Sequence, residues 1–413
     1  MRVLLSAYAC APHRGSELGV GWGWATALAA AGHETHVLTR LRRRADIEQE
    51  MERAPRSGLH FHYHDLPSAL NRALRLFGKG VGGRMRYVLW QITARRRLRT
   101  ILAANRFDAA HHVTFAQFWS PCALTEAARL GVPVIWGPVG GGEREPAAFW
   151  PGLGPRAAAW EAARALLHRF SPWLPWARRA AALCRVAVAA TPETAERLRR
   201  LGARHVIVRS QVALEPDRLA LLGRLADTPR RETRLVYLGD LLPHKGVHLA
   251  LDALARLPGD WRFDIIGDGP SRAWLERRAA RLGIAGKILF HGRLSQDEAW
   301  RLMAGGRALL FPALHDSGGF AAAEAMAAGL PLVCLALGGP GMMAAGGGGI
   351  AVPAPSPAVA VEGLARALRP LIDDVRYGEA LSRQARNEAC ARFSWAAAVD
   401  TVYAAAGLTE GAR

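Results

Sequence analysis

The chain has 413 residues, of which 50% are apolar and 8% aromatic, and its formal net charge is +19 at pH 7. This length favours about two domains of roughly 150 residues each. No run of about 18 uninterrupted apolar residues is present, which argues against a membrane-spanning helix. The first residues contain an apolar run that is too short for a signal peptide, and the five scattered cysteines are typical of reduced thiols. We therefore expect a cytoplasmic protein.

The positive charge is almost entirely arginine, since the only lysines are Lys79, Lys245 and Lys287. GC-rich coding, which favours arginine over lysine, is one explanation. Attraction to an anionic surface, either nucleic acid or phospholipid, is the other. The sequence has no zinc-finger spacing, no aromatic RNA-binding signature and no basic zipper, so we expect no nucleic-acid partner.

The first half of the chain opens as a β-α-β unit. Residues 2–9 and 34–39 are expected strands around a helix over 19–31, which Gly32 ends. Further strands are expected within 107–113, 132–137, 185–191 and 205–210.

The same rhythm starts again at residue 234. Strands are expected within 234–240, 262–269, 287–292, 308–313 and 330–335, alternating with helices over 246–257, 271–282, 295–304 and 319–329. Strands that alternate with helices at this spacing indicate parallel sheets covered on both faces. We therefore predict two doubly wound α/β domains, 1–212 and 213–392, with the break near 209–233.

Two segments do not follow the strand–helix rhythm. Residues 68–100 are basic and amphipathic, and residues 151–185 mix tryptophans with arginines and prolines. A basic helix with aromatic residues on its apolar face can lie in a membrane interface. The alternative is an ordinary surface helix whose arginines are solvated.

The stretch HDSGGFAAAEAM, residues 315–326, carries one carboxylate, Glu324, within a run of small apolar residues. It follows an expected strand and opens an expected helix, so the glycines bring backbone N–H groups close to an anion at the helix N-terminus. We expect Ser317 to cap this helix and Gly318, Gly319 and Phe320 to contact a phosphate or diphosphate. Glu324 is best satisfied by two neighbouring hydroxyls, such as those of a ribose, and Asp316 is placed to reach sugar hydroxyls.

A second candidate site is the loop 239–246, where the rare Lys245 follows a strand and precedes a helix. A lysine in such a loop suits a diphosphate as a compact charge, while the alternative is a solvated lysine. Strand-end turns at Gly267 and Arg293 leave space for a flat base or a backbone contact.

The N-terminal half offers a glycine-rich turn at Gly15–Ser16 and paired histidines, His111 and His112, at the end of an expected strand. The turn does not match the dinucleotide fingerprint, which disfavours a nicotinamide cofactor. Each histidine is either a core residue bonded to backbone or a group in the cleft. No zinc-ligand spacing and no nucleophile-elbow motif is found, so we expect neither a metal nor an acyl-transfer hydrolase.

Together these motifs resemble the retaining glycosyltransferases of family 4, which have the GT-B fold of two facing Rossmann-like domains. The resemblance covers nearly the whole chain and is carried by GSELGVGWGWATALAAAGHETHVLT, GDLLPHKG, IIGDGP, FHGRL and HDSGGFAAAEAMAAGLPLVCL. WGPVGGGE at 136–143 and FSW at 393–395 are similar to a bacterial subgroup that assembles surface polysaccharides. The resemblance implies that a last helix within 393–413 crosses back and completes the first domain.

The resemblance also implies roles for individual residues. The family's two acids map onto Asp316 for the donor sugar and Glu324 for the ribose, and its phosphate-loop lysine maps onto Lys245. Its histidine near the reacting sugar maps onto His111 or His112, and we place Gly15 and Ser16 with the donor-binding residues. Two positions depart from the family: Asp316 replaces a glutamate, and Asp240 stands where arginine is common, so that a cation such as Arg293 has to compensate.

We therefore expect a hexosyltransferase that moves a sugar from a UDP- or GDP-linked donor to a glycan or lipid-linked acceptor, with no cofactor. We expect it in surface-polysaccharide synthesis, at the inner face of the plasma membrane through residues 68–100 and 151–185. Two alternatives stay open at this point. One is a GT-B phosphorylase or sugar-nucleotide epimerase, and the other is a non-catalytic GT-B module at the membrane.

Overall fold

The structure is a computed structural model that describes residues 1–228, 230 and 233–408. It divides into two compact units: residues 1–142, 167–213 and 395–413 form unit 1, and residues 143–166 and 214–394 form unit 2. The change of unit near residue 213 lies within the expected break, of which residues 229, 231 and 232 are outside the described part. Residues 143–166, which we expected in the first domain, pack with unit 2 instead.

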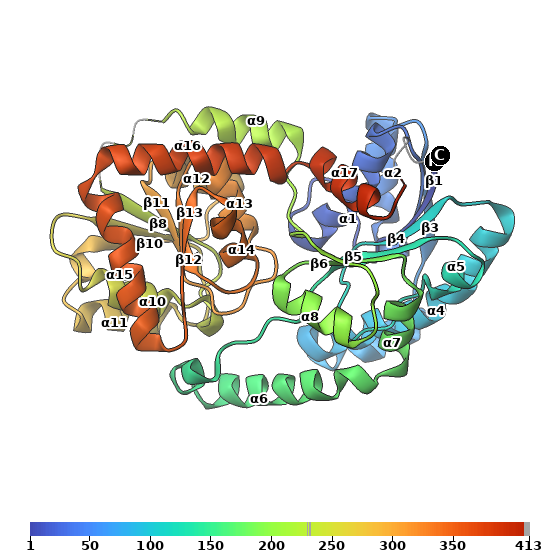
Figure 1. Ribbon diagram of the computed structural model, residues 1–413, viewed down its shortest axis with the longest axis horizontal. Helices are drawn as coiled ribbons and strands as arrows, with labels where there is room; N and C mark the ends of the chain where they lie inside the picture. Colours follow the sequence, from blue (N-terminus) through green and yellow to red (C-terminus); the bar gives the residue numbers. More distant parts are fainter. Residues whose placement is uncertain (229, 231–232, 409–413) are drawn as a thin grey trace. The chain divides into compact units, whose positions relative to one another are not determined.

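The described residues of unit 1 form a seven-stranded parallel sheet in the order β3-β2-β1-β4-β5-β6-β7 (Figure 1). Its strands are β1 (Arg2–Ser6), β2 (Glu34–Arg40), β3 (Leu59–His64), β4 (Ala109–His112), β5 (Val134–Val139), β6 (Val186–Ala189) and β7 (Val206–Val208). The central strands are short apolar runs that are buried on both faces, as parallel sheets require. β3 was not expected, because its sequence LHFHYH is rich in histidine rather than in aliphatic residues.

Helices cover both faces of this sheet. They are α1 (Ser16–Ala30), α2 (Arg44–Arg53), α3 (Ser68–Arg75), α4 (Gly83–Ala104), α5 (Thr125–Arg129), α7 (Pro175–Leu183), α8 (Pro192–Arg200) and α17 (Trp395–Ala405). Short η turns lie next to some of them: η1 (Leu41–Arg43), η2 (Gly78–Gly82) and η4 (Ser171–Trp173), whereas η3 (Ala147–Leu153) belongs to residues 143–166 of unit 2.

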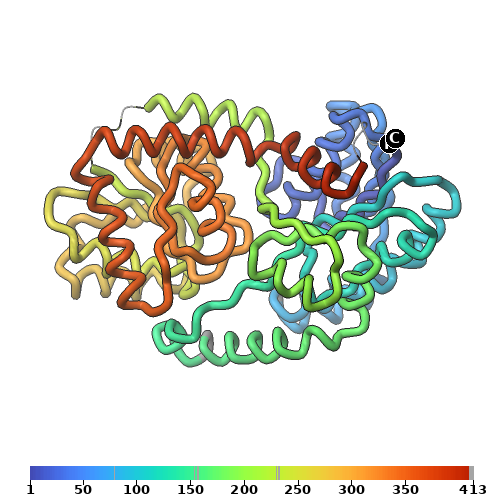
Figure 2. Tube along the Cα trace, viewed as in Figure 1, coloured from blue at the N-terminus to red at the C-terminus, as the bar shows by residue number. Residues whose placement is uncertain are grey.

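The C-terminal helix α17 belongs to unit 1, as the resemblance implied. Figure 2 shows this red end of the chain beside the blue N-terminal segment. A Cβ atom on Gly23 of α1 would lie 2.1 Å from the Trp395 ring, so the glycine is what lets α17 approach α1 this closely. Residues 409–413 lie outside the described part of the chain.

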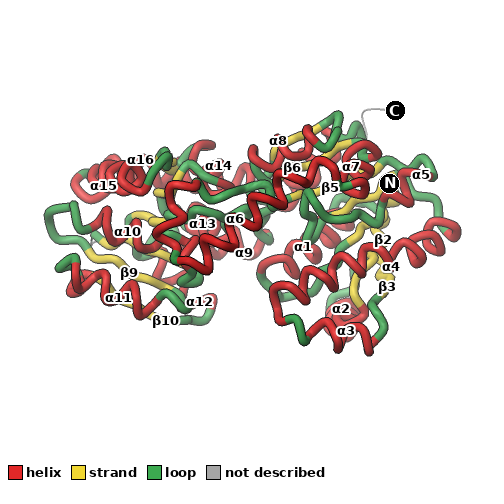
Figure 3. Tube along the Cα trace, turned by 90° about the horizontal axis from the view of Figure 1, so that it is seen from below, coloured by secondary structure: helices red, strands yellow, loops and turns green. Residues whose placement is uncertain are grey.

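The described residues of unit 2 form a six-stranded parallel sheet in the order β10-β9-β8-β11-β12-β13. Its strands are β8 (Arg234–Leu238), β9 (Arg262–Ile266), β10 (Ile288–Gly292), β11 (Ala308–Phe311), β12 (Leu332–Leu335) and β13 (Gly349–Val352). Figure 3 shows these strands in yellow with red helices around them. The helices are α9 (Pro216–Leu225), α10 (Val247–Leu254), α11 (Arg272–Arg281), α12 (Gln296–Ala304), α13 (Phe320–Ala327), α14 (Gly338–Gly346), α15 (Pro357–Asp373) and α16 (Val375–Arg392), with turns η5 (Pro243–Lys245) and η6 (Ala285–Lys287). α6 (Pro155–Phe170) runs across the division between the units at residue 166.

Both sheets have a point at which the strand order reverses. In unit 1 it lies between β1 and β4, and in unit 2 between β8 and β11. Open parallel sheets bind ligands beyond the carboxyl ends of the strands at this point. The loops after β8 and β11 are therefore where a ligand of unit 2 is expected.

Both irregular segments contribute to the hydrophobic core of unit 1. In α4, Tyr87, Trp90 and Leu98 belong to this core, and Ala177 and Ala180 of α7 join it. The same segments also expose apolar side chains outside these two helices, among them Phe77 at 59% and Trp173 at 65%. Among the described residues, the helices are all too short or too polar to cross a bilayer.

Candidate functional site

The two loops at the switch point of unit 2 meet at Lys245 and Asp316. The Lys245 Nζ atom lies 2.5 Å from Asp316 Oδ2, and Leu314 N donates to the His244 carbonyl oxygen at 2.9 Å. Gly246, at φ +69°, permits this approach, because a Cβ atom there would lie 2.0 Å from the Pro312 carbonyl oxygen. The sequence thus brings the rare lysine and the first acid of the 315–326 stretch into direct contact.

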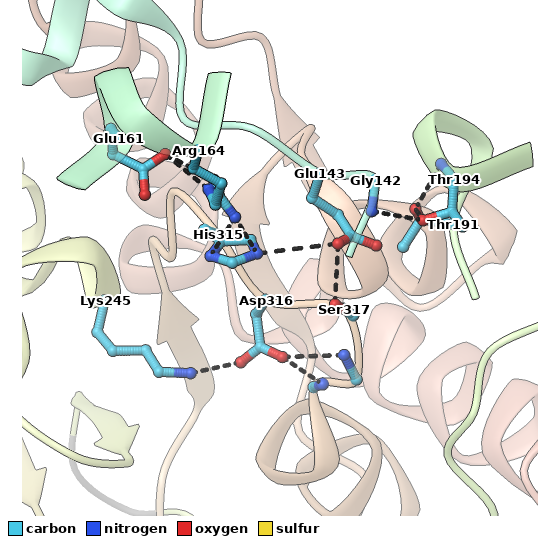
Figure 4. Close-up of polar contacts among 12 residues, drawn as sticks. Gly142, Glu143, Glu161, Arg164, Thr191, Thr194, Lys245, His315, Asp316 and Ser317 are labelled. Atoms are coloured by element: carbon cyan, nitrogen blue, oxygen red, sulfur yellow. Dashed lines mark hydrogen bonds and ion pairs between the residues drawn. The ribbon is translucent and has the colours of Figure 1, made fainter. Parts of the chain in front are cut away.

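Asp316 also bonds to the two glycines that precede the next helix. Its Oδ1 atom accepts hydrogen bonds from Gly318 N at 3.0 Å and Gly319 N at 2.9 Å (Figure 4). Gly319, at φ +75°, is the residue before α13, and Phe320 is the first helical residue. The expectation that Ser317 caps α13 is wrong, because the Ser317 hydroxyl donates to Glu143 and α13 has no side-chain cap among the described residues. The carboxylate therefore occupies both the lysine and the amides that we assigned to a diphosphate.

Glu324 is buried on α13, with 8% of its surface exposed. Its Oε1 atom lies 3.4 Å from Arg218 Nη1, and the Arg218 guanidinium lies over the Trp300 ring at 5.3 Å. Burial raises the pKa of the Glu324 carboxyl above its ordinary value, while a hydrogen bond from the Trp300 side chain and the charge of Arg218 lower it. The site therefore holds a carboxylate with one long ion pair, which leaves capacity to accept hydrogen bonds from a ligand.

The sequence analysis missed a polar network above this loop, which Figure 4 shows. Ser317 Oγ donates to Glu143 Oε2 at 3.0 Å, and the same oxygen lies 3.8 Å from His315 Nε2. Arg164 Nη1 lies 2.9 Å from His315 Nε2, and its Nη2 donates to Glu161 at 2.6 Å. Glu143 and Arg164 come from the segment 143–166, far from the loop in sequence. The resemblance of WGPVGGGE to a known subgroup was the one signal that pointed to this segment.

Glu145, two residues further on, is a second missed carboxyl. It is 5% exposed, and its Oε2 atom has no hydrogen-bond partner among the described residues. Burial and the nearby charge of Glu161 raise the pKa of Glu145 to about 7. This carboxyl therefore changes its charge near neutral pH.

The turns after β8, β9 and β10 pack together beside Lys245. Gly267 N donates to Gly292 O at 2.8 Å, and a Cβ atom on Gly267 would lie 1.9 Å from Gly239 O. Arg293 Nη2 lies 3.2 Å from Asp240 Oδ1, with both side chains largely exposed. Arg293 thus supplies the cation that Asp240 requires at a position where the family commonly has arginine.

The candidate residues of unit 1 are placed differently. His111 and His112 are fully buried in β4. His111 Nε2 lies 2.7 Å from Gly137 O, and burial lowers its pKa to about 3. His112 Nε2 lies 3.1 Å from the Tyr87 hydroxyl, burial lowers its pKa to about 4, and its Nδ1 has no partner among the described residues. These contacts favour the core interpretation that the sequence left open for both histidines.

The turn at Gly15 and Ser16 is exposed and begins α1. Ser16 has φ +56°, which is unusual for a residue other than glycine. The nearby Phe115, at φ +54°, donates its N–H to Glu17 Oε2 at 2.9 Å. Strained residues of this kind gather at functional sites, so the turn stays a candidate ligand contact.

One group of the described side chains has the spacing of a metal site. Glu34, His36 and His60 bring ligand atoms within 4.8 Å of one another on β2 and β3. The sequence could not show it, because the ligands come from paired strands rather than from one motif. Arg2 lies 2.9 Å from the second oxygen of Glu34, so an ordinary ion-pair cluster also accounts for these residues.

Two family models match the chain in tandem. The model described as Glycosyltransferase Family 4 matches residues 22–215, and the model described as Glycosyl transferases group 1 matches residues 226–387. Both halves of the chain thus match glycosyltransferase models, the first half that of family 4. The second match contains Lys245, Asp316 and Glu324, so the polar site of unit 2 lies in the glycosyltransferase group 1 region.

Curated relatives of the chain agree with these matches over part of their length. A glycogen synthase of Mycobacterium tuberculosis is 35% identical over 183 residues, which are 43% of this chain and 43% of the relative. The lipopolysaccharide core biosynthesis glycosyltransferase LpsE of Rhizobium meliloti is 29% identical over 212 residues, which are 51% of this chain and 60% of the relative. The chain thus spans less than two thirds of the length of these relatives.

Solved structures show the same GT-B fold. The lipopolysaccharide outer core galactosyltransferase WaaB superposes with a TM-score of 0.64 at 15% identity, covering 98% of this chain and 99% of the other. HepE of Anabaena, in complex with UDP-glucose, superposes with a TM-score of 0.55 at 16% identity and covers 98% of both chains. At these identities the likeness establishes the fold of the chain and nothing beyond it.

Proposed function

We propose that this protein is a glycosyltransferase that moves a hexose from a nucleotide-diphosphate sugar to a glycan or lipid-linked acceptor and retains the anomeric configuration. The observation that carries the proposal is the group at the switch point of unit 2. Lys245 and the amides of Gly318 and Gly319 meet at the Asp316 carboxylate there, and Glu324 is buried on the helix α13 that follows. A lysine and a helix N-terminus bind a diphosphate, and a carboxylate binds vicinal hydroxyls.

To bind, the donor diphosphate would take the place of the Asp316 carboxylate at Lys245 and the two glycine amides. In the structure Asp316 is paired with Lys245 and capped by the two glycine amides. A diphosphate that engages these groups displaces the Asp316 side chain, which is then free to contact the hydroxyls of the donor sugar. Glu324 holds the ribose, and the charge of Lys245 with the dipole of α13 carries the diphosphate without a metal.

The transfer step follows from these contacts. The bond between C1 of the sugar and the phosphate oxygen breaks, and a bond from the acceptor oxygen to C1 forms on the same face. The acceptor's proton passes to the leaving phosphate oxygen, so no protein carboxylate has to form a covalent intermediate. Lys245 and the α13 amides stabilise the charge that develops on the leaving group, which is the usual main contribution to catalysis.

The donor nucleotide is tested by binding. We propose a UDP- or GDP-linked sugar, with UDP favoured by the complex of HepE with UDP-glucose. The expected result is a rise in melting temperature with one of these in a panel of UDP, GDP, ADP and dTDP sugars, because a ligand that binds the folded state stabilises it. No rise with any member of the panel contradicts the proposed donor class.

The reaction type is tested with a labelled donor. A transferase releases labelled product only when an acceptor is present, whereas an epimerase needs no acceptor and a phosphorylase needs inorganic phosphate. If the labelled sugar changes its configuration in the absence of an acceptor, the protein is an epimerase and the proposal is wrong.

The biological role that we propose is surface-polysaccharide synthesis at the inner face of the plasma membrane. The similarity to LpsE supports the first part. Exposed apolar residues beside arginines within residues 68–100 and 151–185 support the second, among them Phe77, Trp160 and Trp173. Vesicle co-sedimentation should increase with anionic lipid and fall with salt, and binding that depends on neither contradicts the membrane contact.

A further inference from the structure

Unit 1 contains a cavity of about 300 Å³ that the donor site does not use. It lies at the carboxyl ends of the first three strands: Tyr8 follows β1, Arg40 ends β2 and Asp65 follows β3. This is the edge at which open parallel sheets bind their ligands. The remaining wall comes from α3 and α4.

The lining of the cavity is strongly basic. Among the described residues it includes five arginines and one carboxylate, which we call the arginine pocket: Arg40, Arg42, Arg72, Arg75, Arg86 and Asp65. In the described part of the chain, no carboxylate lies within 4.0 Å of any of these guanidinium groups. Asp65 instead accepts hydrogen bonds from Leu66 N at 2.9 Å and Asn71 Nδ2 at 3.2 Å. Asp65 offsets one of these charges through its attraction to Arg40, and four net positive charges remain at the cavity.

The pocket is held in shape by its aromatic floor. The Arg40 guanidinium stacks on the Tyr8 ring at 4.2 Å and its Nε donates to Tyr8 O at 2.9 Å. Trp90 is fully buried and donates its indole N–H to His64 O at 2.9 Å. These contacts fix Arg40 and the pocket floor before any ligand arrives, which lowers the ordering cost of binding.

Exposed apolar side chains continue from the pocket. α3 carries Arg72 and Arg75 and ends there, and the chain runs directly into Leu76 and Phe77, which are 88% and 59% exposed. Val81 and Met85, at 51% and 40%, follow before and within α4. A chain segment that places arginines beside exposed apolar residues suits a molecule with an anionic head and an apolar tail.

We propose that the arginine pocket binds the phosphate group of a lipid-linked acceptor, whose tail lies on Leu76, Phe77, Val81 and Met85. Guanidinium groups bind phosphate oxygens in pairs, and several of them match a group with more than one negative charge. Asp65 and Asn71 remain at the rim for the hydroxyls of a sugar attached to that phosphate. This inference rests on the proposed function, since it assigns the class of acceptor to the same enzyme.

The test is calorimetric titration of the full chain with three probes below their micelle concentrations. Octyl phosphate carries the anion and the tail, inorganic phosphate carries the anion alone, and octyl glucoside carries the tail alone. We expect octyl phosphate to bind most tightly. Equal binding of octyl phosphate and octyl glucoside would overturn the role of the arginines, and equal binding of octyl phosphate and inorganic phosphate would overturn the lipid-borne source.

Matched charge variants locate the binding. The double substitution Arg72→Gln with Arg75→Gln removes two exposed arginines from the pocket, and we expect the Kd of octyl phosphate to rise about 10- to 100-fold. Arg96→Gln with Arg97→Gln removes the same charge from exposed positions of α4 outside the lining, and it should leave the Kd unchanged. Equal effects of the two double variants would show attraction to net charge only and would overturn the pocket.

A third variant separates the pocket from the donor site. Lys245→Ala lies in unit 2 and should not alter octyl phosphate binding, whereas loss of that binding would show that the probe occupies the donor site and would overturn the inference. The proposed transfer is judged independently by labelled product. A chain that transfers sugar but binds octyl phosphate no better than octyl glucoside refutes the inference alone, whereas a chain that binds the probe through Arg72 and Arg75 and transfers nothing refutes the proposed function.

Discussion

The two units differ in how the positive charges of their candidate sites are paired with carboxylates. In unit 2 the single lysine of the candidate donor site is paired with Asp316 at 2.5 Å, and Asp316 also accepts hydrogen bonds from Gly318 N and Gly319 N. In unit 1 the arginine pocket has five guanidinium groups, and its one carboxylate bonds to a backbone amide and to Asn71. A ligand of unit 2 has to displace an internal anion, whereas a ligand of unit 1 meets uncompensated charge.

This difference predicts different selectivity. An internal carboxylate lowers the gain from binding any simple anion, so affinity in unit 2 has to come from the nucleoside as well as from the diphosphate. Uncompensated arginines bind phosphates more generally and are more sensitive to salt, because their charges are exposed. The variants described below test the site of unit 2 on which this difference in selectivity depends.

The largest effect is expected from Lys245→Ala. It removes the only described lysine of the site and leaves Asp316 without its cation. We expect the transfer rate to fall about 100- to 1000-fold, because the leaving diphosphate loses its main charge partner. Steady-state transfer of labelled sugar is the measurement, and Lys287→Ala, whose Nζ bonds to Gly259 O elsewhere in unit 2, is the control. If Lys245→Ala is about as active as the control, Lys245 is not the main charge partner of the leaving diphosphate.

The second effect is expected from Glu324→Gln, which keeps the shape of the side chain and removes the charge. If Glu324 holds the ribose, affinity for a nucleoside diphosphate should fall about 10- to 100-fold, as expected when a charged hydrogen-bonding partner is lost. Affinity for inorganic pyrophosphate should not change. Calorimetry with both ligands distinguishes the two outcomes, and a parallel loss for pyrophosphate would place Glu324 on the phosphates instead.

A smaller effect of opposite sign is expected from Asp316→Asn. The amide oxygen can still accept from Gly318 and Gly319, but Lys245 loses its internal counter-ion. Nucleoside diphosphate should therefore bind about 10-fold more tightly, since removing a charged competitor is worth about 1.5 kcal/mol, while sugar transfer falls. Asp252→Asn, which disturbs the Arg278 pair on α10, serves as the control. Weaker binding in Asp316→Asn would show that Asp316 does not compete with the diphosphate.

The last prediction concerns the stability of the fold rather than binding or transfer. Glu145 is a carboxyl with no cation partner among the hydrogen bonds and ion pairs of the described residues. Its folded pKa of about 7 exceeds the ordinary 4.5, so the folded state binds more protons between these values. Stability should fall as pH rises from 4.5 to 7, by about 3 kcal/mol at about 1.4 kcal/mol for each unit. Glu145→Gln should remove this fall and raise the melting temperature above that of the wild type at pH 8. Thermal melts at pH 4 and pH 8 test this, with a substitution at an exposed position of α11, Glu276→Gln, as the control. If the wild type and Glu145→Gln show the same change in melting temperature with pH, the raised pKa of Glu145 is wrong.

Much of the fold could be predicted from the sequence because apolar strands alternate with helices at regular spacing. The strands of unit 2 up to β12 lie within the expected ranges. β3 and β13 were not predicted, because LHFHYH and GIAV lack a long aliphatic run. Only their pairing with β2 and β12 makes them strands.

The candidate donor site was predictable to the level of its loops but not of its contacts. Lys245, Asp316 and Glu324 follow from loop position and burial. The hydrogen bonds of Asp316 to Gly318 N and Gly319 N could not be foreseen, because they depend on the backbone conformation of the loop. Glu143 and Arg164 could not be found by spacing, since more than 150 residues separate them from His315 and Ser317.

The path of the chain has a consequence for dissecting the molecule. The chain changes unit after residues 142, 166, 213 and 394, and residues 143–166 bring Glu143 and Arg164 to the loop of His315. A single cut at residue 213, between the two family matches, leaves unit 2 without this segment and unit 1 without α17. If related enzymes exchange their C-terminal halves at that position, the part transferred is an incomplete unit 2. A functional chimera therefore has to carry residues 143–166 together with residues 214–394.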